Sequence, residues 1–160
     1  MTKRQLTHLR DDGEARMVDV SAKAETERMA RAAGSIRMQP ETLDAIRTNS
    51  LKKGDVLAVA RVAGVMAAKK TAELIPLCHP VALTDVQIAI ELDPKLPGLR
   101  VEATTRTFGR TGVEMEAISA VCVTLITVFD MAKGVDRSML VSDITLLEKS
   151  GGKSGHLKKG

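Results

Sequence analysis

Apolar and polar positions alternate with a period of two in three segments of the chain. Residues 86–92 place apolar side chains at every second position, which predicts a half-buried strand. The turn sequence DPKLPG follows, and residues 101–107 continue the alternation as the antiparallel partner. Residues 139–149 predict a last strand with Ile144 and Leu146 on its inner face.

Two longer segments have the pattern of helices. The segment 117–129 has no charged side chain, and a helix over 115–133 would be about 28 Å long. The uncharged part is shorter than the ~20 residues that cross a bilayer, so we expect a buried scaffold helix and no membrane role. The Ala- and Gly-rich segment 55–74, capped by Asp55, predicts a helix that packs closely on another helix. A shorter helix is expected over 40–49, with proline in its first turn.

The remaining segments predict short or irregular structure. Residues 17–20 have the pattern of an edge strand, and residues 35–38 that of a short strand. The charged stretch 23–31 is expected to be mostly a solvated connector. Two prolines in IPLCHP, residues 75–80, predict a rigid connector that cannot stay helical.

From residue 35 onward the order is strand, helix pair, strand, strand, helix, strand. This order predicts an α+β fold of the ferredoxin-like βαββαβ type, an antiparallel sheet with helices packed on one face. We expect one domain over 16–149, a flexible N-terminal segment over 1–15 and a flexible Gly/Lys-rich tail over 150–160.

Composition limits the classes of function. The chain has 24 Lys and Arg against 20 Asp and Glu, a modest excess that favours anionic ligands without requiring nucleic acid. Cys78 and Cys122 are the only cysteines, so no disulfide framework is expected. The N-terminus has no apolar run of signal-peptide length, which favours the cytoplasm.

Several charged groups are candidates for chemistry. Asp130 and Lys133 lie three apart, so they share a helix face and could transfer protons, or they could form an ordinary surface salt bridge. Basic side chains at the ends of predicted elements suit a polyphosphate as a set, although each alone could be a surface charge. That set is Lys23, Arg28, Lys52, Lys53, Lys69, Lys70, Arg110 and Lys149.

A second group surrounds the proline-bounded loop and the start of the long helix. His79 lies in that loop beside Cys78, where its ring would be held in one orientation. Glu114 or Glu116 could accept paired N–H groups of a guanine-like ring, or could simply stabilise a helix N-terminus. Neighbouring residues seldom reach one ion together, so no metal site is predicted.

Four motifs together resemble a known family over residues 17–156. They are MVDVSAKAETERMARA, AGVMAAKKTAELIPLCHP, FGRTGVEMEAISAVCVTLITVFDMAKGVDR and LLEKSGGKSGH, in that order. They closely resemble the molybdenum-cofactor biosynthesis protein C (MoaC) family. The resemblance implies a ferredoxin-like fold, a homohexamer built as a trimer of dimers, and active sites at subunit interfaces.

The resemblance also implies an activity. Family members convert 3′,8-cyclo-7,8-dihydro-GTP, the product of a radical-SAM GTP cyclase, into cyclic pyranopterin monophosphate and release pyrophosphate. No redox cofactor is implied, and neither is Mg²⁺, although Mg²⁺ is possible. By motif match the catalytic residues are Asp130, Lys133, Lys53 and Lys149. The substrate-binding residues are Leu77, Cys78, His79, Met115 and Glu116 for the ring, Glu114 as a further candidate, and Lys23, Arg28 and Lys69 for the triphosphate.

The alternative is a non-catalytic ferredoxin-like module that binds RNA or nucleotides. Such sheets stack bases on aromatic side chains, and the predicted strands contain none apart from Phe108 at a strand end. A salt-dependent gel shift on random RNA would separate the two hypotheses.

Overall fold

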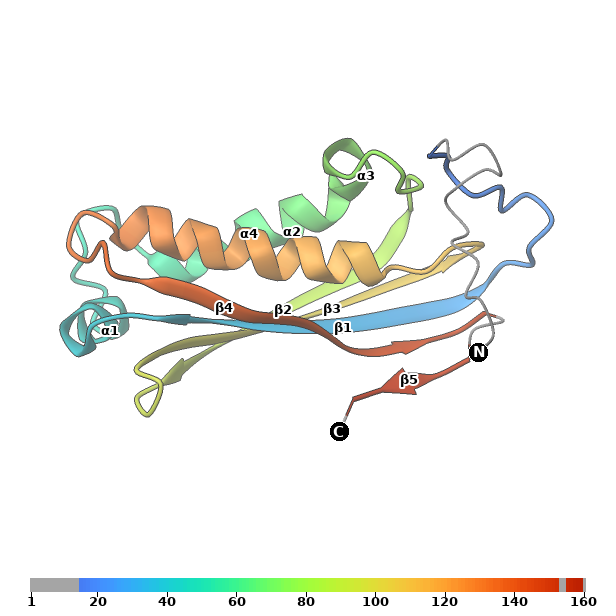
Figure 1. Cartoon of the computed structure of the whole chain (residues 1–160). Coiled ribbons are helices and arrows are strands. Elements are labelled where there is room, and N and C mark those ends of the chain that lie inside the picture. Colours follow the sequence, from blue (N-terminus) through green and yellow to red (C-terminus); the bar gives the residue numbers. More distant parts are fainter. Residues whose placement is uncertain (1–14, 153–154, 160) are drawn as a thin grey trace.

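An antiparallel sheet carries two long helices on one of its faces (Figure 1). The computed structural model describes residues 15–152 and 155–159. Of the expected flexible N-terminal segment, residues 1–14 lie outside this description. The division into a domain over 16–149 with two flexible ends therefore stays a prediction.

The sheet of the described residues has five strands in the order β2-β3-β1-β4-β5, and all neighbours are antiparallel. The strands are β1 (Thr26–Arg37), β2 (Leu83–Asp93), β3 (Gly98–Gly109), β4 (Leu140–Ser150) and β5 (Leu157–Lys158). Because β3 lies between β1 and β2, the first four strands have the predicted ferredoxin-like arrangement. Within the expected tail, β5 pairs with the end of β4.

The helices are α1 (Pro40–Arg47), α2 (Val56–Lys69), α3 (Thr71–Leu74) and α4 (Glu114–Ala132). The long helix was predicted to within one residue at each end. The predicted 55–74 helix is divided at Lys70 into α2 and α3, and Asp55 Oδ1 accepts the predicted cap hydrogen bond from Ala58 N at 2.9 Å. The helix α4 packs on β1, β3 and β4, while α2 packs on β2 and along α4.

Two glycines allow close packing against α4, and the packing of Gly64 is the helix-on-helix contact that the small residues of 55–74 predicted. A Cβ on Gly34 of β1 would lie 2.8 Å from side-chain atoms of Leu125 and Val121, so α4 sits directly on the strand. A Cβ on Gly64 of α2 would overlap the Thr124 hydroxyl. Since real Cβ atoms do not approach so closely, larger side chains at either position would separate the layers.

The helix α4 is the centre of the core. Its sheet-facing side chains, Ala117, Val121, Leu125 and Val128, are fully buried. By length and composition α4 could cross a membrane, but 56% of its most apolar window is buried inside the protein. The expectation of a buried scaffold helix is therefore confirmed.

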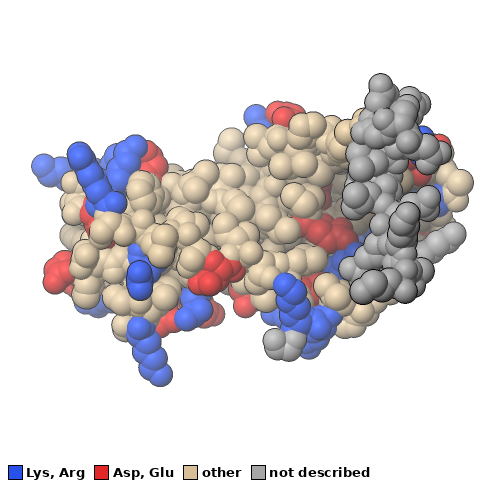
Figure 2. All heavy atoms as spheres, in the orientation of Figure 1, with Lys and Arg blue, Asp and Glu red and all other residues tan. Residues whose placement is uncertain are grey.

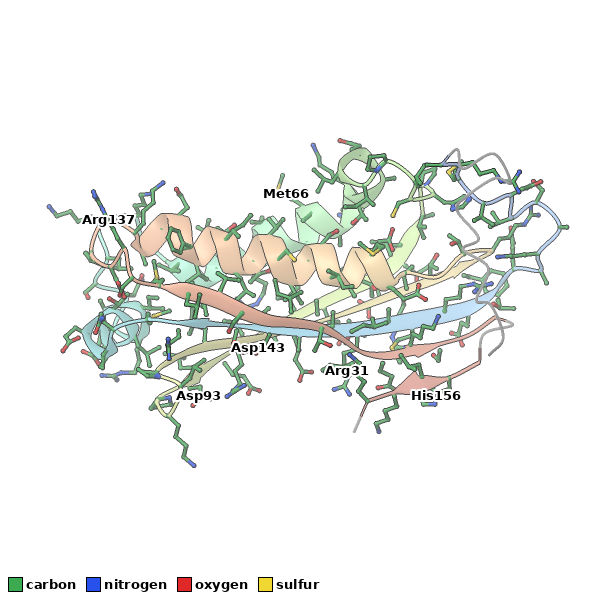
Figure 3. All side chains as sticks on the ribbon, viewed as in Figure 1. Arg31, Met66, Asp93, Arg137, Asp143 and His156 are labelled. Carbon is green, nitrogen blue, oxygen red and sulfur yellow. The ribbon has the colours of Figure 1, made fainter. Side chains whose placement is uncertain are left out.

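The interpretation of residues 23–31 as mostly a solvated connector was wrong for residues 26–31. These residues begin β1, the strand that pairs with both β3 and β4. Charged residues occupy the open face of the sheet there, where Arg31 pairs with Glu102 at 3.2 Å and with Glu148 at 3.3 Å. Figure 3 shows Arg31 on the side of the sheet away from the helices.

Two smaller strand predictions also differ from the structure. Residues 17–20 form no strand, and the predicted strand over 35–38 is the end of the much longer β1. In β4, Leu146 packs against the core as expected, and Ile144 lies beside Gly34 on the same inner face, with 42% of its surface exposed. Ile144 follows Asp143, whose φ of 59° lies in the left-handed region where the pairing of β4 with β1 shifts register.

Candidate active site

A cavity of about 550 Å³ opens at the N-terminal end of α4. The proline-bounded loop supplies Leu77, Cys78 and His79, and the first turn of α4 supplies Met115 and Glu116. The remaining lining residues are Ile75, Thr111, Gly112 and Glu114. The structure thus brings together every residue that the resemblance assigned to the ring of the substrate.

Glu116 is the buried charged group of this cavity, with 4% of its surface exposed. Burial raises its pKa to about 6, and the nearby Glu114 carboxylate acts in the same direction. The pKa of the Cys78 thiol is also raised, first by burial and then by Glu116. At neutral pH the cavity therefore holds a poorly solvated carboxylate, which is a strong acceptor for N–H groups.

His79 is held by the backbone of the segment before the sheet. Its Nε2 lies 2.7 Å from the carbonyl oxygen of Val18. A carbonyl oxygen only accepts, so Nε2 is the donor of this hydrogen bond. The segment 17–20 was predicted as an edge strand, and one of its backbone carbonyls instead orients a side chain of the cavity.

A smaller cationic pocket, of about 140 Å³, adjoins the first. Its basic lining residues are Lys23, Arg28, Arg110 and Lys149, and it shares Thr111, Gly112 and Glu114 with the larger cavity. Lys149 Nζ lies 2.9 Å from Glu114 Oε1. The Arg28 guanidinium donates to the carbonyl oxygens of Gly109 at 2.9 Å and Arg110 at 3.1 Å, which fixes its position.

The third cluster lies at the opposite end of α4. Asp130 accepts hydrogen bonds from Lys133 Nζ at 2.6 Å and from Lys53 Nζ at 3.1 Å, and Lys53 also reaches the Asp130 carbonyl at 2.9 Å. Lys133 first, and then Lys53, lowers the pKa of Asp130. All three side chains are more than half exposed. Figure 2 shows Lys and Arg side chains gathered at this end of the molecule.

The predicted site residues therefore form two separate groups within one chain. Glu116 and Asp130 lie fourteen positions apart on α4, which corresponds to about 21 Å. Lys149, which the resemblance placed in one catalytic set with Asp130, lies with Glu114 at the other end. Lys69 is exposed at the end of α2 and lines neither of the two cavities.

Some lining residues were not assigned from the sequence. Arg110 was predicted only as one of the basic set that suits a polyphosphate, and Ile75, Thr111 and Gly112 had no predicted role. The signal was the position of Arg110-Thr111-Gly112 just before α4, because backbone N–H groups before a helix favour anions. In the described parts of the chain, no three His, Cys, Asp or Glu side chains are grouped as a metal site would require.

On this α+β fold, an apolar cavity with a buried carboxylate is joined to a cationic pocket, a combination that would suit a ring with attached phosphates. Comparison with known proteins identifies the family. The family model described as the MoaC family matches residues 17–152, and the chain belongs to this family.

Curated relatives cover nearly the whole chain. A cyclic pyranopterin monophosphate synthase of Parvibaculum lavamentivorans is 56% identical over 158 residues, covering 99% of both chains. Proteins of the same name from Desulfitobacterium hafniense and Brucella ovis are 55% and 58% identical, and cover 95% and 94% of this chain and 93% and 92% of their own length.

The raised pKa of Glu116 predicts a pH-dependent gain in stability for Glu116→Gln. A carboxyl whose pKa rises on folding favours the folded state while protonated, and that contribution is lost as pH rises through about 6. Wild type then carries a buried charge that Gln lacks, so the variant should be more stable by about 2 kcal/mol at pH 8. The difference should vanish near pH 4, as measured by urea unfolding at fixed protein concentration. A difference that is equal at both pH values would contradict the buried-charge explanation.

Proposed function

We propose that this chain is a cyclic pyranopterin monophosphate synthase of molybdenum cofactor biosynthesis. Its substrate is 3′,8-cyclo-7,8-dihydro-GTP, supplied by a radical-SAM GTP cyclase in the cytoplasm, and its products are cyclic pyranopterin monophosphate and pyrophosphate. The observation that carries the proposal is the ring-sized cavity joined to a cationic pocket through Thr111, Gly112 and Glu114. Relatives of this name, 55–58% identical over nearly the whole chain, support it.

The two pockets divide the substrate between them. The purine-derived ring lies in the apolar cavity, where the Glu116 carboxylate accepts its N–H groups and Leu77 and Met115 cover its faces. The triphosphate lies in the pocket of Lys23, Arg28, Arg110 and Lys149, whose charges offset the charge that develops on the leaving pyrophosphate.

The Asp130 cluster supplies the proton transfers. Opening the purine ring, forming the pterin and closing the cyclic phosphate each move protons but transfer no net electrons, so we propose no redox cofactor. The lowered pKa keeps the Asp130 carboxyl ionised at neutral pH, ready to accept a proton. Lys133 and Lys53 lie within hydrogen-bond distance of it and can return protons to the substrate.

A second copy of the chain completes the site. One copy holds its ring cavity and its Asp130 cluster at opposite ends of α4, so two copies related by a two-fold axis across α4 bring unlike ends together. The outer face of the helical layer suits such contact, because Val59, Val62 and Met66 of α2 and Ile126 of α4 are each about half exposed. Figure 3 shows Met66 pointing away from the sheet, and Figure 2 shows few charged side chains over the middle of α4. We propose that dimers formed on this face assemble into the homohexamer.

The RNA-binding alternative receives no support from the open face of the sheet. Three of its arginines have acidic partners: Arg31 pairs with Glu102 and Glu148, Arg100 with Asp93 and Arg106 with Asp85. Such neutralised pairs leave little positive charge for a phosphate backbone.

Direct assay tests the proposed function. The purified chain is incubated with 3′,8-cyclo-7,8-dihydro-GTP, with and without Mg²⁺, and both products are measured. Equal amounts of pyrophosphate and cyclic pyranopterin monophosphate are expected, and GTP as the control substrate should give neither. A protein that binds the substrate but forms no product under either condition, or that shifts random RNA in a gel, would overturn the proposal.

A further inference from the structure

Asp136 is a buried carboxylate that the proposed reaction does not use directly. It lies in the loop between α4 and β4 with 5% of its surface exposed. Its Oδ2 accepts a hydrogen bond from Gln39 N at 2.8 Å, and its Oδ1 accepts from Ser138 N at 2.8 Å and from Ser138 Oγ at 2.7 Å. The Thr42 side chain in the first turn of α1 adds a further hydrogen bond.

These hydrogen bonds connect two segments that carry parts of the Asp130 cluster. Asp136 lies six positions after Asp130, just beyond the end of α4, whereas its partners Gln39 and Thr42 belong to the start of α1. The chain leaving α1 runs directly to Lys53, whose ammonium group binds Asp130. The segment from α1 to Lys53 is therefore held to the end of α4 at two points: at its start by Asp136, and at Lys53 by Asp130. Figure 1 shows α1 and the end of α4 at the same end of the molecule.

We propose that Asp136 is a positioning residue: it anchors the start of α1 to the loop after α4 and thereby keeps the Lys53 ammonium group on Asp130. The catalytic consequence rests on the proposed function of Asp130, whereas the geometric consequence does not. Lys53 and Asp130 are 77 positions apart in the chain, and both side chains are exposed. Such a contact holds a fixed geometry only if the segments beneath it are fixed.

The charge of Asp136 is part of this anchor. Burial alone would raise its pKa, but the hydrogen bonds from Gln39 and Ser138 outweigh burial, and the pKa is lowered. An ionised carboxylate is acceptor-only at both oxygens, which matches partners that all donate. In Asp136→Asn one oxygen becomes an NH₂ group that faces a donor, so one side of the anchor is broken while the side-chain volume is kept.

The test compares Asp136→Asn with Asp143→Asn as the matched control. Asp143 also accepts two side-chain hydrogen bonds, from Ser35 and Ser142, and its pKa is lowered too, but it lies in β4 away from the Asp130 cluster. Two quantities are measured in the full-length protein: kcat and KM for the proposed substrate, and the pKa of Asp130 from Asp ¹³Cγ NMR, assigned by its loss in Asp130→Asn. The charged groups that the described residues place against Asp130 are Lys133 and Lys53. The pKa of Asp130 measured in Lys53→Met therefore serves as the reference value for a protein that has lost the Lys53 contact.

In Asp136→Asn we expect the pKa of Asp130 to rise toward its value in Lys53→Met, and kcat to fall about 10- to 100-fold with little change in KM. Asp143→Asn should change neither quantity. A fall in thermal stability with the pKa of Asp130 and kcat unchanged would show a merely structural role and overturn the proposal.

Two further outcomes can be told apart: a variant that does not fold, and a wild-type protein that makes no product. If Asp136→Asn does not fold, Ser138→Ala removes only one donor and should shift the pKa of Asp130 in the same direction by less, and no shift would overturn the proposal. If the pKa of Asp130 shifts but wild type makes no product, the positioning role stands and the proposed function fails.

Discussion

Asp130→Asn is expected to abolish formation of cyclic pyranopterin monophosphate while the oligomer stays folded. Asn keeps the shape of the side chain but cannot take a proton, and its single oxygen can replace only one of the two carboxylate oxygens that Lys133 and Lys53 contact. Since a positioned acid or base contributes about 100- to 10,000-fold to rate, kcat should fall by that factor. Asp130 is 57% exposed, so its replacement leaves no cavity and no buried unpaired group. Product formation measures the first effect, and size-exclusion chromatography with thermal unfolding measures the second.

A matched control is available on the surface of α1. Asp44 forms an exposed ion pair with Arg47, three positions along the helix, just as Asp130 does with Lys133. Asp44→Asn therefore removes an equivalent surface ion pair that touches neither cavity nor the Asp130 cluster, and kcat should stay at the wild-type value. If Asp130→Asn turns over substrate as fast as Asp44→Asn does, Asp130 is not the catalytic group.

Most of the fold follows from periodicity. The uncharged segment 117–129 can only be a buried element, and its length and charged ends set the bounds of α4 closely. The alternation of β2 and β3 and the turn between them are local signals, as is the Asp55 cap of α2. For these elements, which the local sequence specifies, prediction and structure agree.

β1 shows why the rest could not be predicted. Its first half carries charged residues on both faces, so its alternation does not separate polar from apolar positions. The reason lies in distant residues: Arg31 is satisfied by β3 and β4, and the Arg28 guanidinium by carbonyls after β3. No pattern within 23–31 contains those partners.

The same limit applies to the candidate site. The sequence identified most of its residues, because the proline-bounded loop and the start of α4 are recognisable motifs. It could not show that Glu116 is buried, or that Lys149 pairs with Glu114 at one end of α4 while Lys53 binds Asp130 at the other. Each of these features depends on segments that are far apart in the chain. Because the two clusters lie at opposite ends of α4, a shared pocket would need one end from each of two copies.

Mixing two inactive variants should restore activity if two copies form each site. Glu116→Gln lacks the ring-binding carboxylate and Asp130→Asn lacks the catalytic one, so each oligomer alone should be inactive. When each pocket takes its Glu116 end from one copy and its Asp130 end from another, random mixing in equal amounts makes about a quarter of the pockets fully wild type. The measurement is product formation after co-expression or subunit exchange.

A second mixture makes the result quantitative. The double variant Glu116→Gln/Asp130→Asn mixed equally with wild type should also show about a quarter of wild-type activity per pocket if sites are shared between copies, because both ends must come from wild-type chains. Sites contained within single chains would instead give about half in this mixture and none in the first. If sites are not shared, activity in the first mixture therefore falls below a quarter and activity in the second rises above it. A loss of stability or incomplete subunit exchange cannot produce both of these changes. Because the two ends of α4 are about 21 Å apart in one chain, the shared arrangement is the one expected.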